Sequence, residues 1–349
     1  MSRHPTLDLL EIDPGTVKIL VIKQTSLGDV LHATAVLRSI RKTYPAAQLA
    51  FLTSTTAADI LRYNPGIDRL LLFDRYKVKR DWWRHPAWAL AHILETTQAV
   101  RFEQYDLAID LQGSWKTVIF LWAARAERRL VKGRWWFAER FRQPQLHAIE
   151  EMQGVLQLAG ILPADPALEV FVSESERNAV TARLDELGLA GRRLAVFSPM
   201  TRWPTKDWPL EHFLSLARML PDDWFVVVTG SETERGGLDA FTKNLSAGRA
   251  ACLAGQLTLL EFSELVNRAD VVVTGDSFPM HLAAAHKRPL VALFGPTDES
   301  RVGPQESGQV VRADVGCRRC YRRVRCDRRC IEKITVDQVL VAVKRVTTT

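Results

Sequence analysis

A strand–helix–strand pattern between Asp270 and Pro304 limits the possible folds more than any other part of the sequence. The apolar, β-branched run at 271–274 predicts a buried strand, and the turn Gly275-Asp276-Ser277 supplies residues that favour a helix N-terminus. Residues 280–285 predict a helix, and residues 289–294 predict a second buried strand. Turns of such a βαβ unit lie at the carboxyl edge of a parallel sheet, where ligands bind.

Strands and helices alternate along the rest of the chain as well. Further strands are predicted at 18–22, 49–53, 69–73, 106–111, 128–131, 194–198 and 224–230. A chain of 349 residues is too long for one ordinary core. We therefore expect an α/β protein with two Rossmann-like parallel-sheet domains, at 1–160 and 161–334, that direct their loops at a shared cleft. We expect the linker at 161–174, and a last helix within 335–349 that packs back on the first domain.

The charge and the tryptophans indicate anionic partners. The formal net charge is +7, and seven of the ten tryptophans fall between Trp82 and Trp136. Basic residues mixed with tryptophan are typical of surfaces for nucleic acid, anionic membranes or acidic substrates, although a solvated basic face is the simpler alternative. The first fifteen residues lack the apolar core of a secretory signal, and no run approaches the ~20 apolar residues of a membrane span. We therefore expect the cytoplasm.

Three consecutive strand ends in the second half carry polar side chains suited to a nucleotide. The first loop contains Thr201 and Lys206, which can donate to a phosphate. In the next, Glu232 can accept from ribose hydroxyls. The third loop contains Asp276, Ser277 and His281. Helix caps and surface charges remain the alternative for any one of them.

The turn after the first strand contains a candidate general base. Gly28-Asp29 opens a helix in the first half, as Gly275-Asp276 does in the second. A carboxylate at a helix N-terminus tends to stay ionised, so Asp29 can take a proton from an acceptor hydroxyl. Ser26, Gly28 and His32 share this segment and are acceptor-side candidates, with His32 the next candidate base. The alternative for Asp29 is simple helix capping.

Four motifs in order resemble those of the ADP-heptose:lipopolysaccharide heptosyltransferases, glycosyltransferase family nine. They are KILVIKQTSLGDVLHATAVLRSIRKTYP, TRWPTKDWPLEHF, TGDSFPMHLAAA and LFGPTDESRVGP, and the resemblance extends from Lys18 to about Val346. It implies the GT-B fold and metal-independent, inverting transfer that requires no cofactor. By this resemblance Asp29 is the catalytic base, Thr201 and Lys206 contact the donor diphosphate, Glu232 contacts the ribose or adenosine, and Asp276, Ser277 and His281 hold the sugar nucleotide.

The resemblance predicts transfer of heptose, or a related sugar, from an ADP-sugar to a lipopolysaccharide core or similar glycolipid at the inner face of the cytoplasmic membrane. Phe278 stands where many members have glycine, and Trp203-Pro204 makes the preceding loop bulky. A different nucleotide-sugar donor, or a protein acceptor, therefore stays open as an alternative. The rival from another class is a non-catalytic nucleic-acid-binding protein, which leaves the three polar strand ends unexplained; we expect no nucleic-acid partner.

Four of the five cysteines fall within fourteen residues, at Cys317, Cys320, Cys326 and Cys330. In a cytosolic protein this spacing favours metal over disulfides, and a structural zinc ion is the leading interpretation. Free thiols and disulfides are the alternatives. Cys252 lies in an apolar strand and is interpreted as a core residue.

Overall fold

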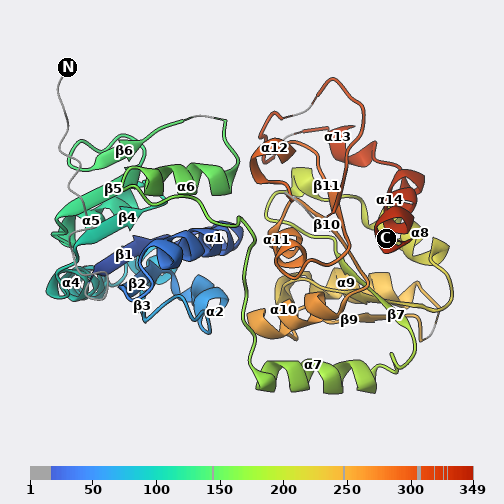
Figure 1. The fold of residues 1–349 in the computed structure, drawn as a ribbon. Helices are drawn as coiled ribbons and strands as arrows, with labels where there is room; N and C mark the ends of the chain where they lie inside the picture. The colour runs from blue at the N-terminus through green and yellow to red at the C-terminus, as the bar shows by residue number, and fades with distance from the viewer. Residues whose placement is uncertain are drawn as a thin grey trace. The chain divides into compact units, whose positions relative to one another are not determined.

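The computed structural model describes residues 17–143, 145–246, 248–304, 308–317, 319–324, 326–327 and 329–348. The chain divides into two compact units, Met1–Glu169 and Val170–Thr349, and each has its own sheet (Figure 1). The predicted α/β class with two parallel-sheet domains is confirmed.

The first unit is built on a six-stranded parallel sheet in the order β3-β2-β1-β4-β5-β6. Its strands are β1 (Lys18–Ile22), β2 (Gln48–Thr53), β3 (Arg69–Leu72), β4 (Leu107–Asp110), β5 (Arg128–Lys132) and β6 (Glu139–Phe141). Its helices are α1 (Leu27–Thr43), α2 (Ala58–Leu61), α3 (Arg75–Asp81), α4 (Pro86–Phe102), α5 (Trp115–Ala123) and α6 (Ala148–Gln157), with a 3-10 turn at Thr55–Ala57. Because parallel crossovers are right-handed, the sheet is covered on both faces. Helices α1 and α6 pack together, and α4 packs on α5 on the other side of the sheet (Figure 1).

The second unit repeats this plan with the order β12-β11-β10-β7-β8-β9. Its strands are β7 (Arg193–Ser198), β8 (Trp224–Val228), β9 (Ala250–Cys252), β10 (Val271–Gly275), β11 (Leu290–Leu293) and β12 (Gln309–Val311). Its helices are α7 (Glu174–Glu186), α8 (Leu210–Met219), α9 (Arg235–Lys243), α10 (Leu259–Arg268), α11 (Phe278–Ala285), α12 (Glu299–Val302), α13 (Arg329–Glu332) and α14 (Val336–Thr348), with 3-10 turns at Pro204–Lys206 and Glu232–Glu234. The central strands β7, β8 and β10 are almost wholly buried, as their apolar runs predict.

The last helix, α14, packs in the core of the second unit. The buried face of α14, with Val339, Leu340 and Val343, joins the core cluster of the second unit. It packs against α8 and β11 of that unit. Its apolar stripe thus completes the second core, and additional packing on the first domain stays a prediction. The Trp208 indole donates to the Ile334 carbonyl oxygen at 2.9 Å and fixes the segment that leads into this helix.

The predicted linker belongs mainly to the first unit. The Ala164 amide donates to Ser39 Oγ at 2.9 Å, and the Glu169 amide donates to Thr34 Oγ1 at 3.0 Å. Arg38 also pairs with Asp165, with 2.9 Å between Nη1 and Oδ2. These bonds from α1 hold the segment, so the compact first unit continues to Glu169 rather than stopping at residue 160.

Replacing Ser39 with alanine should release this segment locally. We expect the Ala164 amide to exchange its hydrogen about fivefold or more faster in Ser39→Ala, because a hydrogen bond of this kind contributes about 1 kcal/mol. Hydrogen exchange read by NMR checks this, with the Glu169 amide on Thr34 as the internal control. Equal exchange of Ala164 in both proteins would contradict the contact.

Candidate functional site

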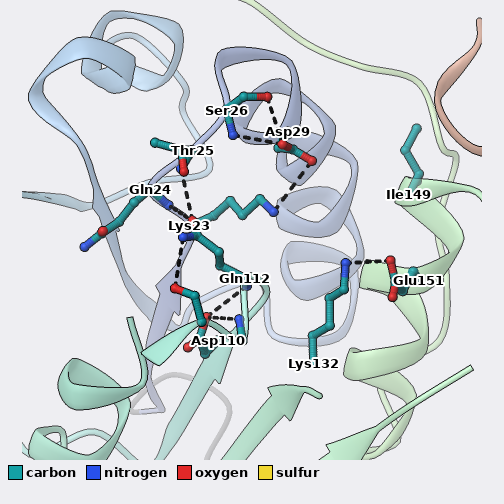
Figure 2. Close-up of polar contacts among 12 residues, drawn as sticks. Lys23, Gln24, Thr25, Ser26, Asp29, Asp110, Gln112, Lys132, Ile149 and Glu151 are labelled. Atoms are coloured by element: carbon teal, nitrogen blue, oxygen red, sulfur yellow. Dashed lines mark hydrogen bonds and ion pairs between the residues drawn. The ribbon is translucent and has the colours of Figure 1, made fainter. Parts of the chain in front are cut away.

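The candidate base Asp29 lies in the first turn of α1, directly after β1. Its Oδ2 accepts from the backbone amide and from the hydroxyl of Ser26, both at 2.8 Å. Its Oδ1 lies 3.7 Å from Lys23 Nζ (Figure 2). The carboxylate thus caps the helix, as the alternative interpretation of the sequence requires. Its side chain is nevertheless 39% exposed, so the same group is accessible from solvent.

Charged side chains beneath Asp29 set its ionisation. Lys23 is only 4% exposed, and burial lowers its pKa, although the negative charge of Asp29 opposes this effect. Burial raises the pKa of Asp110, whose carboxylate accepts from the Gln112 and Gly113 amides. Nearby, Lys132 Nζ lies 2.6 Å from Glu151 Oε2 (Figure 2). A buried lysine next to a half-exposed aspartate favours the anion at that aspartate.

The pKa of Asp29 lies below its ordinary value. Burial alone would raise it, but the Lys23 ammonium ion outweighs that effect, together with the Ser26 hydrogen bonds and the positive charge that His32 can carry. Asp29 is therefore an ionised carboxylate at neutral pH. It can accept a proton, and its weak basicity suits a hydroxyl that becomes acidic only as it attacks.

The other acceptor-side candidates lie in different environments. Ser26 is exposed at the start of α1, and Gly28 is buried in its first turn. His32 is 3% exposed, and its ring centroid lies 5.7 Å from that of His147 at the start of α6. The burial of His32 makes it a poorer candidate for contact with an acceptor than Asp29.

Lys206 and Asp276, predicted on separate loops of the second unit, are in contact. Lys206 Nζ donates to Asp276 Oδ2 at 2.5 Å and to the Asp276 carbonyl oxygen at 3.2 Å. The side chains are 13% and 8% exposed. Parallel strands β7 and β10 are neighbours, so their carboxyl-terminal loops converge. The pair is the charged centre of the candidate donor site.

Thr201 and Ser277 line the same two loops. A Cβ on Gly275 would lie 3.2 Å from Thr201 Cγ2 and 3.1 Å from the Lys206 carbonyl oxygen, so this glycine permits the close approach of the loops. The Thr201 amide donates to Asp207 Oδ1 at 2.8 Å, which fixes the start of the loop. The Ser277 hydroxyl lies 3.1 Å from Thr274 Oγ1 at the end of β10.

Glu232 and His281 occupy the neighbouring loop and helix. Glu232 has a side chain that is 67% exposed, and its Oε1 lies 3.6 Å from Arg235 Nη1. A Cβ on Gly255, which has a φ of +69°, would clash with Glu232, so the two loops touch. Because this carboxylate is exposed at the end of β8, contact with a ribose suits it better than a buried structural role does. His281 is 8% exposed, within α11.

Several residues of these sites have no role predicted from the sequence. Lys206 Nζ lies 4.3 Å from the Trp203 ring centroid, and the Arg323 guanidinium carbon lies 4.5 Å from it. The sequence predicts only that Trp203 is bulky. In the structure its ring lies next to the two cations Lys206 and Arg323. Lys23, Asp110, Lys132 and Glu151 were also missed. The signal for Lys23 was its position directly after the strand KILVI, because burial of the four apolar residues Ile19 to Ile22 carries the next residue inward.

The four clustered cysteines differ in their exposure to solvent. Cys317 and Cys320 are exposed, Cys326 is half-buried and Cys330 is buried. Burial and the neighbouring thiols raise the pKa of Cys330. Among the residues that the structure describes, which include all four cysteines, no three His, Cys, Asp or Glu side chains are arranged to hold a metal ion. The structural zinc ion therefore stays a prediction.

Two Rossmann-like units in one chain are the mark of the GT-B class. Solved glycosyltransferases have the same fold as this chain. Glycosyltransferase family 9 from Veillonella parvula superposes with a TM-score of 0.80 at 21% identity, over 95% of this chain and 97% of that one. Escherichia coli heptosyltransferase WaaC with ADP superposes with a TM-score of 0.74 at 20% identity, over 95% and 100%.

The sequence gives the family itself. Residues 93–329 match the sequence profile of glycosyltransferase family 9 (heptosyltransferase), and the chain belongs to this family. It is 28% identical to lipopolysaccharide heptosyltransferase 2 of Salmonella typhimurium, over 88% of this chain and 90% of that protein. It is 23% identical to the lipopolysaccharide core heptosyltransferase OpsX of Haemophilus influenzae, over 82% and 81%. The protein is thus a glycosyltransferase, as the motifs indicated.

Proposed function

We propose that this protein transfers heptose from ADP-heptose to a lipopolysaccharide core acceptor with inversion at the anomeric carbon. The observation that carries the proposal is the Lys206–Asp276 pair, a nearly buried cation at the carboxyl edge of a Rossmann-like sheet. An ammonium has three N–H donors, and Asp276 accepts from two of them. The third can bind a diphosphate oxygen, and relatives whose solved structures contain ADP support this donor.

In the proposed reaction Asp29 accepts the proton of an acceptor hydroxyl. The hydroxyl oxygen forms a bond to the anomeric carbon, and the bond from that carbon to the donor phosphate breaks. ADP leaves with the bonding electrons, and Lys206 stabilises the negative charge that develops on the diphosphate. Thr201 and Ser277 would donate to phosphate oxygens, Glu232 would accept from the ribose, and His281 would support the sugar-nucleotide loop.

The proposal is tested by incubating the full-length protein with ADP-heptose and a heptose-deficient core acceptor. The expected product is the acceptor extended by one heptose, with ADP released in equal amount. Parallel reactions with other ADP-sugars, other nucleotide-heptoses and a protein acceptor address the alternatives that Phe278 and Trp203 leave open. Transfer only from another donor would replace ADP-heptose in the proposal.

Replacing Lys23 should change the pH dependence of this reaction. In Lys23→Met, Asp29 loses the cation 3.7 Å away, so its pKa should rise and the acid limb of kcat should move to higher pH. The matched control is Lys132→Met, which removes a lysine paired with Glu151 instead. A pH–rate series on the three proteins checks this. Equal acid limbs in all three would show that Lys23 does not tune Asp29.

We further propose that the protein works in the cytoplasm, at the inner face of the membrane that holds its acceptor. None of the described helices has the length and apolarity to cross a membrane. Cell fractionation tests the location. Recovery mainly in the membrane fraction at low salt, with release at high salt, is the expected result for peripheral attachment.

A further inference from the structure

Helix α5 presents large apolar side chains to solvent. Trp115, Ile119 and Trp122 follow one another at helical spacing on a single side of the helix, and they are 71%, 41% and 61% exposed. Its other side, with Val118 and Leu121, is buried in the core of the first unit. The helix therefore has two apolar sides, and one of them faces water. An exposed stripe of this kind marks a surface that binds something.

The neighbouring helix α4 also exposes apolar side chains. Helices α4 and α5 pack together, and they lie on the same side of the first sheet (Figure 1). Leu90 and Leu94, one turn apart on α4, are 51% and 49% exposed. Trp83 precedes α4 by one turn and is 88% exposed. We call these six residues, Trp83, Leu90, Leu94, Trp115, Ile119 and Trp122, the α4–α5 face.

Positive charges border the α4–α5 face. Residues 75–102 contain six Lys/Arg and two Asp/Glu, a local excess of 6 − 2 = +4. Lys116 Nζ lies 5.3 Å from the Trp115 ring centroid, and Lys77 Nζ lies 4.4 Å from that of Trp88. The Trp135 indole donates to the Gly113 carbonyl oxygen at 2.9 Å, which brings the loop after β5, with Arg134, to the start of α5. Trp136 in this loop is 86% exposed.

Tryptophan rings and aliphatic side chains bordered by lysine and arginine suit the boundary between lipid headgroups and acyl chains. Single-stranded nucleic acid would use stacking rings, but Leu90, Leu94 and Ile119 offer no such platform. A two-fold pairing of copies through this face would bring the same basic border together with itself, which is unfavourable. Charge complementarity therefore favours an anionic bilayer.

We propose that the α4–α5 face docks the protein on an anionic membrane, with its tryptophans at the level of the lipid headgroups and its lysines and arginines on the lipid phosphates. This surface lies on helices separate from the Asp29 and Lys206 loops. The inference rests on the proposed attachment to the membrane and names the surface that makes it. Because it is tested without any sugar substrate, its failure can be distinguished from failure of the proposed transfer reaction.

The test is co-sedimentation of the full-length protein with vesicles of phosphatidylglycerol and phosphatidylcholine, or of phosphatidylcholine alone. We expect binding to the anionic vesicles, and weaker binding to neutral ones or in about 0.5 M salt, where charges are strongly screened. The variant Trp115→Gln/Trp122→Gln should partition about tenfold or more weakly. Brominated lipid should quench the tryptophan fluorescence of the wild-type protein, and quench that of the variant less.

A single variant on the α4–α5 face, Ile119→Gln, is compared with a matched control variant, Leu162→Gln. Leu162 is 73% exposed, in the first unit, next to the segment that α1 holds on the other side of the sheet. Only Ile119→Gln should weaken binding. Failure of the wild-type protein to bind anionic vesicles would overturn the proposal. Undiminished binding by Trp115→Gln/Trp122→Gln would overturn it as well. Two other results would also overturn the membrane proposal. They are retention on single-stranded oligonucleotide, or dimerisation in sedimentation velocity, that depends on these tryptophans while vesicle binding does not.

Discussion

Asp29→Asn is expected to lower the turnover of sugar transfer by about 10²–10⁴, the usual effect of losing a general base. Asparagine keeps the size of the side chain, and its amide oxygen can still accept the hydrogen bonds that Ser26 donates at 2.8 Å. It cannot take a proton from the acceptor. ADP affinity, which we assign to the second unit, should not change. Steady-state kinetics and calorimetric titration with ADP measure the two quantities.

The wild-type enzyme should lose activity as the pH falls through the pKa of Asp29. Because that pKa is lowered, the carboxylate stays charged down to a pH below the ordinary titration range of aspartate, and the acid limb lies there. Asp106→Asn is the matched control, since Asp106 accepts from the Lys18 amide at 2.7 Å and has only a structural role. Near-normal turnover by Asp29→Asn would leave Asp29 as a helix cap, with His32 the next candidate.

Lys206→Ala is expected to weaken ADP binding by about 1.5–3 kcal/mol, the contribution of a charge-assisted hydrogen bond. The loss has two causes. The diphosphate loses its cation, and Asp276, 8% exposed, is left as an unpaired negative charge beside it. Calorimetric titration with ADP measures the change, and turnover should fall as well.

A second variant separates these two causes. Lys206→Ala/Asp276→Ala removes the unpaired carboxylate and should recover part of the ADP affinity. Lys243→Ala, which removes a lysine near the end of α9, is the charge-matched control and should bind ADP normally. ADP binding by folded Lys206→Ala at the wild-type affinity would exclude Lys206 from the donor site.

Much of the fold follows from apolar periodicity. The strand predicted at 18–22 matches β1, and the strand predicted at 194–198 differs from β7 by one residue. Buried parallel strands are continuous apolar runs, so the central strands are easy to recognise. The strands β6 and β12 were missed, since each has three residues at a sheet edge and a mixed pattern of burial. Local pattern carries little information about such short edge strands.

Contacts between distant residues account for most of the other differences. The hydrogen bond from the Ala164 amide to Ser39 joins residues 125 positions apart. From composition alone, the segment that contains Ala164 resembles a free linker. Likewise the spacing of the four cysteines predicts proximity along the chain, but not that Cys317 is exposed while Cys330 is buried. In contrast, the Lys206–Asp276 contact follows from topology, because β7 and β10 are adjacent.

The placement of α14 in the second core has a consequence for biosynthesis. Val339 and Val343 pack in the same cluster as Trp224 and Val273, which the ribosome makes many residues earlier. The first unit has all its core residues once translation passes Glu169, so it can fold while synthesis continues. The second unit exposes the apolar surface that α14 will cover until Val343 has left the ribosome. In this interval the nascent chain depends most on chaperones, and a premature stop just before Val336 would yield an aggregation-prone product rather than a slightly shorter enzyme.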